Sequence, residues 1–202
     1  MASKPSDPRA GGAPLSAKLV IAGGFGVGKT TFVSAVSEVT PFTTEEVITA
    51  ASSTVDDRRF VGGKTTTTVA MDFGRISVES GLVLFLFGTP GQDRFGFMWD
   101  DIVRGALGAI VLVDTRRLED CFPAVDYFEE RRIPFTVVLN QFEGAPRHEP
   151  AEVREALDLQ DDVPLTVCDA RDRESVKAAI LVLLHHLLAL IQARGPVEAT
   201  TA

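Results

Sequence analysis

The chain has 202 residues, 45% of them hydrophobic and 24% charged, which is typical of one globular domain with a substantial core. Its net charge of −8 at pH 7 argues against nonspecific binding to nucleic acid and against docking on an anionic membrane surface. The two cysteines, Cys121 and Cys168, match no metal-binding spacing, and no hydrophobic run suggests a membrane span. We therefore expect a cytoplasmic protein without a direct membrane anchor.

The first part of the chain contains one clear strand and one clear helix. Residues 1–16 hold three prolines and few apolar side chains, and we expect a disordered leader there. The apolar run from Leu19 to Ala22 predicts a short buried strand, and the helix spacing begins after a loop, over Thr31 to Val36. In the polar stretch that follows, Glu45 to Ala51 fits a short helix and a strand equally well.

From residue 69 onward, predicted strands alternate with predicted helices. The strands cover 69–78, 82–87, 109–113, 135–139 and 165–167. The helices run through 102–105 and cover 119–131, 150–157 and 173–193. The first two strands form a hairpin, so that one edge strand is antiparallel. This order predicts an α/β fold with a six-stranded, mostly parallel sheet covered by helices on both faces, in one domain over 17–193 with a flexible tail at 194–202.

A glycine-rich loop joins the first strand to the first helix. Gly23 to Thr30 fits G-x-x-x-x-G-K-[ST] at every fixed position, which is the pattern of a phosphate-binding loop. Glycines allow backbone N–H groups to converge on an anion, and the helix N-terminus adds partial positive charge. Lys29 is expected to reach the β- and γ-phosphates, and the Thr30 hydroxyl to bind Mg²⁺. The predicted phosphate-binding residues are Gly24, Gly26, Val27, Gly28, Lys29, Thr30 and Thr31.

A second polar motif, Asn140-Gln141-Phe142-Glu143, follows the 135–139 strand. In such a sheet the ligand lies at the carboxyl ends of the strands. A carboxylate there is able to accept hydrogen bonds from N1–H and the exocyclic amine of guanine, which adenine does not offer in the same way. The alternative is a simple capped turn, since asparagine and acidic residues are common in turns. Beside a phosphate-binding loop, we favour base recognition by Asn140, Gln141 and Glu143.

Taken together, these motifs make the chain resemble a Ras-like small GTPase, and more closely the bacterial branch of MglA and the conservon-encoded (CvnD-like) GTPases. The resemblance covers residues 17 to about 192. It implies a P-loop NTPase fold and a GTP/GDP switch with slow, Mg²⁺-dependent hydrolysis. It also implies two partners besides GTP, which are a roadblock-type regulator and a sensor-kinase system.

The resemblance further implies roles for three other segments. In Thr68-Val69-Ala70-Met71-Asp72-Phe73, Thr68 matches the switch I threonine that closes on Mg²⁺ and the γ-phosphate, with Thr67 as the alternative register. Gly88-Thr89-Pro90-Gly91-Gln92 resembles switch II, where the Gly91 N–H senses the γ-phosphate and Gln92 orients the attacking water. Cys168-Asp169-Ala170-Arg171 resembles the last base-binding loop, where the Ala170 N–H meets the guanine carbonyl. Gln92, Lys29 and Thr68 are thus the predicted catalytic residues, and Asp169, Ala170 and Arg171 join the nucleotide-binding set.

The chain departs from the Ras pattern at four positions. Gly88 stands where an aspartate usually holds Mg²⁺ through water, and Phe25 occupies a loop position that is commonly glycine. Gln141 replaces the usual lysine of the base motif and Glu143 the usual aspartate. These departures predict looser nucleotide binding and slow intrinsic hydrolysis.

Three alternatives stay open at the level of sequence. Arg58 or Arg59 would supply an arginine to the transition state, although a solvated charge run explains both. Asp114, which ends a strand, fits a place near the nucleotide and a turn or cap equally well. The protein as a whole is also compatible with a nucleotide-binding module that has little turnover, or with a P-loop phosphotransferase or ATPase.

Overall fold

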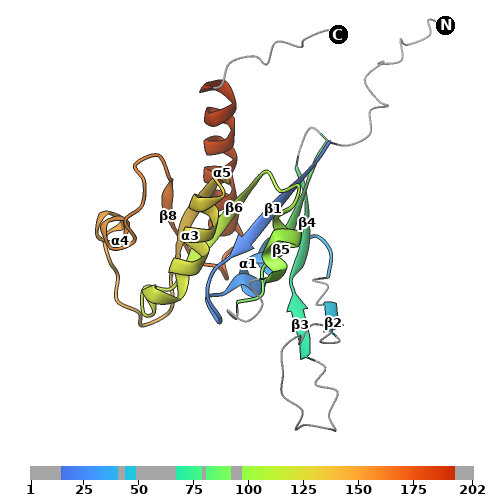
Figure 1. Cartoon of the computed structure of the whole chain (residues 1–202), viewed down its shortest axis with the longest axis horizontal. Coiled ribbons are helices and arrows are strands. Elements are labelled where there is room, and N and C mark those ends of the chain that lie inside the picture. Colours follow the sequence, from blue (N-terminus) through green and yellow to red (C-terminus); the bar gives the residue numbers. More distant parts are fainter. Residues whose placement is uncertain (1–14, 41–43, 49–66, 79–80, 92–96, 194–202) are drawn as a thin grey trace, which may run out of the picture.

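The computed structural model describes residues 15–40, 44–48, 67–78, 81–91 and 97–193. It contains the predicted six-stranded sheet, in the order β4-β5-β1-β6-β7-β8 (Figure 1). The strands are β1 (Leu15–Ala22), β4 (Phe73–Val78), β5 (Leu82–Gly88), β6 (Gly108–Val113), β7 (Phe135–Asn140) and β8 (Leu165–Cys168). All neighbours pair in parallel except the edge strand β4, which is antiparallel to β5. The predicted fold class is confirmed.

Helices cover both faces of this sheet. They are α1 (Lys29–Val36), α2 (Trp99–Val103), α3 (Phe122–Glu130), α4 (Pro150–Ala156) and α5 (Arg173–Ala193). One core lies between the sheet and the pair α1 and α5, and it contains Phe32, Ile180 and Leu183. The other lies between the sheet and α2, α3 and α4, around Phe128. Every residue of β6 and β7 is buried, as expected for central parallel strands.

Several element ends differ from the prediction. β1 begins at Leu15, inside the segment predicted as a leader, and residues 1–14 and the tail at 194–202 lie outside the described residues. The helix predicted over 119–131 begins as a 3-10 turn at Leu118–Cys121, and α3 follows it with Pro123 in its first turn, where a missing N–H costs nothing. The predicted bounds of the last helix are those of α5.

The segment predicted as a single strand over 69–78 is two strands. β3 (Thr67–Met71) pairs with β2 (Thr44–Ile48) in a separate two-stranded sheet, and β4 starts after Asp72. The ambiguous segment near Glu45 is therefore a strand. Asp72 marks the point where the chain passes from one sheet to the other, at the edge of the main sheet where β5 ends (Figure 1).

The helix α5 has an apolar composition along its whole length. Among the helices that the structure describes, α5 alone is long enough and apolar enough to cross a membrane, judged by length and composition only. The sequence analysis did not anticipate this. A core helix meets the same criteria, and α5 buries Val176, Ala179, Ile180, Leu183 and Leu187 in the protein. Its composition is therefore weak evidence for a membrane span.

Candidate nucleotide-binding site

The predicted site residues in the described part of the chain lie along one edge of the sheet, where the parallel strands end. The phosphate loop follows β1, the Asn140 motif ends β7, and the loop of Asp169 follows β8. α/β proteins with parallel sheets bind ligands in the crevice at this edge.

The phosphate loop has the backbone conformation that its glycines allow. Gly26 and Gly28 have φ angles of 75° and 101°, in the left-handed region that glycine adopts without strain. A Cβ atom on Gly28 would lie 2.6 Å from Nδ2 of Asn140, so the loop also packs closely on the end of β7. The helix α1 begins directly after Gly28, which directs its N-terminus toward the loop.

Lys29 lies folded against the loop. Its Nζ donates hydrogen bonds to the carbonyl oxygens of Gly23 and Gly24, both at 2.7 Å, and the residue is 8% exposed. Burial lowers the pKa of Lys29 to about 8, although the negative charge of Asp72 acts in the opposite direction. An ideal Cβ on Gly91 would lie 2.5 Å from the same Nζ, which places the loop after β5, predicted as switch II, against the lysine. A bound phosphate group would give the Lys29 ammonium a negatively charged partner, whereas the two carbonyl oxygens are uncharged.

Two side chains with oxygen atoms, Thr30 and Asp72, meet beside the first turn of α1. The Thr30 hydroxyl donates a hydrogen bond of 2.9 Å to Oδ2 of Asp72, whose residue is 9% exposed. A hydroxyl and a carboxylate are hard donors of the kind that Mg²⁺ prefers, and Mg²⁺ commonly takes its other ligands from nucleotide phosphates and water. Within the described residues there is no group of three or more His, Cys, Asp or Glu side chains able to hold a metal by itself. The donors present therefore fit a cation that binds together with a nucleotide.

Asn140 connects three segments that are far apart in the sequence. Its side chain is buried, and Nδ2 donates to the carbonyl of Val27 at 2.9 Å while Oδ1 accepts from the N–H of Ala170 at 3.0 Å. The phosphate loop, the end of β7 and the loop after β8 are thus held together by one carboxamide. This arrangement brings together the phosphate-binding and base-binding residues that the sequence predicted.

The loop after β8 carries an ion pair at the surface. Arg171 binds Asp169 through two side-chain hydrogen bonds of 2.9 and 2.8 Å, which, with a further bond from the Arg171 N–H, lower the pKa of Asp169 to about 2. The Glu143 carboxylate is 93% exposed and lies 3.9 Å from the Arg171 guanidinium. The Ala170 N–H, predicted to meet a base carbonyl, donates to Asn140 in this structure.

A cavity of about 310 Å³ opens at the same place. It is lined by Asn140, Gln141, Glu143, Asp169 and Arg171 of the predicted set, together with Thr115, Leu139, Phe142, 144–148 and Val167. Its volume lies at the lower end of the range of small-molecule pockets. The base-motif residues therefore line a hollow, and Phe142 to Ala145 also form a hydrogen-bonded turn, so the choice between base recognition and a simple turn stays open.

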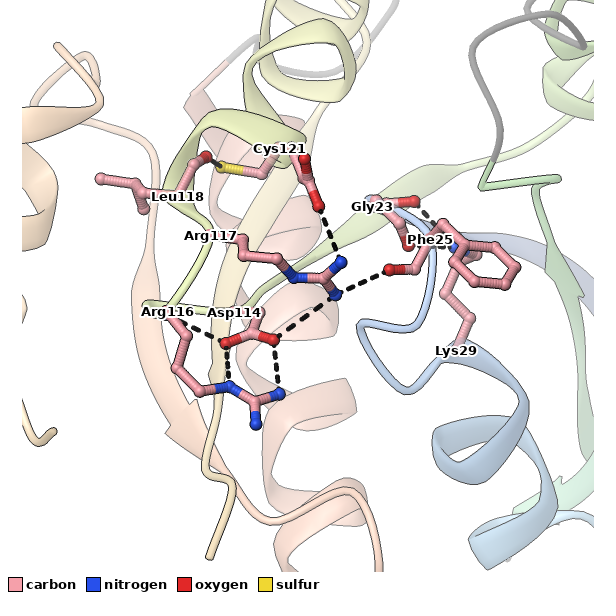
Figure 2. A network of polar contacts seen from close by, with 10 residues as sticks. Gly23, Phe25, Lys29, Asp114, Arg116, Arg117, Leu118 and Cys121 are labelled. Carbon is pink, nitrogen blue, oxygen red and sulfur yellow. Dashed lines mark hydrogen bonds and ion pairs between the residues drawn. The ribbon is translucent and has the colours of Figure 1, made fainter. Parts of the chain in front are cut away.

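The turn after β6 contains Asp114, to which the sequence analysis gave two possible roles, and two arginines that it did not single out, Arg116 and Arg117. The buried Asp114 accepts hydrogen bonds from Nε and Nη2 of Arg116 at 2.8 and 2.7 Å, and one from the Arg116 N–H at 3.0 Å. Figure 2 shows the neighbouring Arg117 guanidinium, which donates to the carbonyl of Phe25 at 2.9 Å and pairs with Asp120 at 3.4 Å. The Arg116 guanidinium also stacks on the Phe142 ring, 3.9 Å from its centre. Of the two roles open to Asp114, the structure supports the turn.

Other predicted residues are described only in part. Gln92, Arg58 and Arg59 lie outside the described residues, and Thr68 is described only as a backbone position in β3. Thr31 is exposed on α1, and the Phe25 side chain is 64% exposed. The roles assigned to these residues stay predictions.

Comparison with known proteins adds a family and a fold. The family model described as "Conserved hypothetical ATP binding protein" matches residues 21–190. The uncharacterized protein MJ1339 of Methanocaldococcus jannaschii is 30% identical over 76 residues, which cover 37% of this chain and only about half, 49%, of that protein. The human Ras-related protein Rab-7b is 26% identical over 185 residues, covering 87% of this chain and 84% of Rab-7b.

Solved structures of G domains share the fold. The FeoB G-domain of Methanococcus jannaschii has a TM-score of 0.59 at 13% identity, covering 86% of this chain and 99% of that one. The G domain of the T. maritima FeoB iron transporter has a TM-score of 0.60 at 15% identity, covering 85% and 98%. The chain thus has the fold of a P-loop G domain, and its family and phosphate loop make it a nucleotide-binding protein.

Proposed function

We propose that this chain, which belongs to the family described as conserved hypothetical ATP binding protein, binds GTP and GDP with Mg²⁺ and acts as a molecular switch that hydrolyses GTP slowly. The observation that carries the proposal is the Asn140 carboxamide, which joins the phosphate loop to both base-binding loops. A nucleotide bound across these three segments would contact all of them at once. Slow turnover suits a switch, because the γ-phosphate must persist to hold the switch loops in order.

Guanine rather than adenine is proposed on the strength of Glu143. Its carboxylate lines the base cavity and is exposed, and its only described ion pair is a 3.9 Å surface contact with Arg171, so the side chain is able to turn toward a bound base. A carboxylate accepts hydrogen bonds from the N1–H and amine of guanine, whereas adenine presents an acceptor at N1. The likeness to Rab-7b supports the same choice, and the printed description of the family makes ATP the alternative.

Each predicted residue has a role in the proposed hydrolysis. Gln92 orients the attacking water, and Lys29 with the loop N–H groups stabilises the charge on the transferred phosphoryl group. The Gly91 N–H senses the γ-phosphate. Thr30 and Thr68 would hold Mg²⁺, which supplies charge neutralisation at the phosphates when bound. An arginine, where one is used, comes from a partner or from Arg58 or Arg59.

The wider setting is proposed from the resemblance to the MglA and conservon GTPases. We expect a roadblock-type regulator and a sensor-kinase system as partners, a cytoplasmic location, and signalling or cell polarity as the process. The G domain would extend from the start of β1 at Leu15, rather than from the predicted residue 17, to residue 193, with a leader before it and a tail at 194–202.

The test is nucleotide affinity for GDP, a slowly hydrolysed GTP analogue and ADP, with and without Mg²⁺. We expect GDP to bind far better than ADP, and Lys29→Ala to lower GDP affinity roughly 100-fold because a charged contact to phosphate is lost. The exposed Lys177→Ala on α5 is the matched control and should bind as the wild type does. Glu143→Gln should reduce the preference for GDP over ADP, with Glu155→Gln as its control. Equal binding of ADP and GDP by the wild type would overturn the proposed guanine selectivity.

The two other functions differ in the fate of the phosphate. Release of phosphate from GTP alone supports the switch, and transfer to a small-molecule acceptor would support a phosphotransferase. Binding with no release over hours would support a nucleotide-binding module, which the replacement of glycine by Phe25 and of aspartate by Gly88 also favours.

A further inference from the structure

We propose that the Asp72 carboxylate supplies the metal-binding carboxylate that is missing at Gly88, as an oxygen ligand of the nucleotide's divalent cation or of its bound water. The inference deepens the proposed function and rests on nucleotide binding at this site. In Ras-like proteins the carboxylate that holds Mg²⁺ lies at the end of the strand before switch II. Here that role would pass to the junction between β3 and β4.

Sheet register places Asp72 directly beside Gly88. β4 pairs with β5 so that Phe73 lies opposite Phe87, and the Gly88 N–H donates to the Asp72 carbonyl at 2.8 Å. An ideal Cβ on Gly88 would lie 2.9 Å from the Asp72 Cβ and 3.0 Å from its Oδ2. The Asp72 side chain thus occupies the space that an aspartate at position 88 would need, and it brings a carboxylate there from the neighbouring strand.

The carboxylate points to the metal side of the site. Its Oδ2 accepts a 2.9 Å hydrogen bond from the Thr30 hydroxyl, the group that ligates Mg²⁺ in a phosphate loop of this pattern. Its negative charge also acts on the adjacent Lys29 ammonium. Asp72 therefore contacts the hydroxyl that is proposed to bind the cation, and it lies near enough to the lysine that is proposed to bind the phosphates to act on its charge.

Asp72 is buried with few partners of its own. Among the side chains that the structure describes, it takes part in no ion pair and accepts one hydrogen bond, from Thr30. A buried carboxylate is costly unless it is paired or bound to a metal. A divalent cation bound with the nucleotide would supply the missing counter-charge, and one carboxylate is as many as Mg²⁺ commonly takes when phosphates and water complete its shell.

The competing explanation is that Asp72 only caps Thr30 and stabilises the fold. The two explanations separate on metal dependence. A structural cap would change the stability of the protein without changing the concentration of Mg²⁺ that nucleotide retention requires, whereas a metal ligand would change that concentration.

The experiment measures release of a fluorescent GDP at increasing Mg²⁺ and in excess chelator. Asp72→Asn, which keeps an acceptor for Thr30, should raise the half-maximal Mg²⁺ concentration roughly 10-fold or more, as loss of a metal's supporting ligand usually does. Release in chelator should stay within about twofold of the wild type, since the phosphate contacts are intact. Asp101→Asn, an exposed carboxylate on α2, is the control. An unchanged Mg²⁺ requirement in Asp72→Asn would overturn the proposal.

A double variant tests the position of the carboxylate directly. Asp72→Gly combined with Gly88→Asp moves the carboxylate to β5 and removes the whole side chain that it would meet, including the Cβ atom of residue 72. This variant should regain a Mg²⁺ requirement within about threefold of the wild type, and it carries the test if Asp72→Asn does not fold. If the wild type binds ADP instead of GDP, the same titration with ADP still decides the role of Asp72. If it binds no nucleotide, both this proposal and the proposed function fail.

Discussion

Two buried carboxylates lie at the same edge of the sheet, and they are used in different ways. Asp114, after β6, is 3% exposed and accepts three hydrogen bonds from Arg116, with Arg117 3.8 Å away. Asp72, before β4, is 9% exposed and accepts one hydrogen bond among the described side chains, from a neutral hydroxyl. The protein itself supplies charged partners to the first carboxylate, whereas the described part of the chain supplies only one hydroxyl to the second.

The difference distinguishes a carboxylate that stabilises the protein scaffold, Asp114, from one that is proposed to bind a metal ion, Asp72. The hydrogen bonds from Arg116 lower the pKa of Asp114, because they stabilise its charged form. Through Arg116 and Arg117 the same turn contacts Phe142 of the base motif and the carbonyl of Phe25 in the phosphate loop. Asp114 therefore stabilises the contacts to the two loops. Asp72, with one described hydrogen-bond donor, keeps the acceptor capacity that a metal ligand needs.

Removing Asp114 should have the largest effect on stability. Asp114→Ala deletes a buried acceptor of charged hydrogen bonds, and we expect a loss of about 2–3 kcal/mol in the free energy of unfolding. Asp72→Ala should cost about 1 kcal/mol, since one hydrogen bond from a hydroxyl is lost while the cost of burying a carboxylate without a charged partner is removed. Urea denaturation of the two variants measures both values. Equal losses would remove the distinction between the two carboxylates, and an altered Mg²⁺ requirement in Asp114→Ala would contradict its structural role.

Acid should abolish the advantage that Asp114 gives. The folded-state pKa of Asp114 lies below its ordinary value of 3.8, so its contribution to stability is present above that value and is lost as the pH falls through the folded pKa. The difference in unfolding free energy between the wild type and Asp114→Ala should be full at pH 6 and shrink below pH about 4. Urea denaturation at a series of pH values tests this. A difference that stays constant down to pH about 3 would mean that the charge of Asp114 contributes nothing.

The smallest effect is expected at the Cys121 thiol, at the end of the 3-10 turn that follows Arg117. Cys121 is 2% exposed and donates to the carbonyl of Leu118 at 2.9 Å, and burial raises its pKa to about 12 (Figure 2). It should resist alkylation in the native wild type at pH 8. Labelling should become several times faster in Asp114→Ala, because the turn opens more often, and should not change in Asp72→Asn. The buried Cys168 at the end of β8 is the internal control, followed at the same time by mass spectrometry. Equal acceleration at both thiols would indicate global rather than local opening.

Local patterns in the sequence were sufficient for the sheet and for the phosphate loop. Apolar runs and glycine spacing identified β1, β6, β7 and the loop of Lys29, and the amphipathic pattern of α5 gave its bounds. The break at Asp72 was missed, because the residues on both sides of it have the composition of a strand whichever strand is the partner. The apolar run 69–71 is followed by Asp72 and Phe73 with no proline between them, while the pairing changes from β2 to β5.

The contacts among the site residues could not be predicted from the sequence, because they depend on how the chain folds. Asn140 was identified by its motif, but its bonds to Val27 and Ala170 join residues 113 and 30 positions away. The absence of a carboxylate at Gly88 was visible in the sequence, whereas the replacement by Asp72 appears only when the register of two antiparallel strands is known. The pairing of Asp114 with Arg116 resembles an ordinary surface charge run until burial is known.

The short distance between positions 72 and 88 has an evolutionary consequence. Because a side chain at 88 would collide with Asp72, the carboxylate cannot be moved between the strands by one substitution. One single-step intermediate has two crowded negative charges, and the other has none. We expect the two positions to covary among relatives, with a carboxylate at one and a small uncharged residue at the other. An exchange between the two arrangements would therefore need both substitutions together.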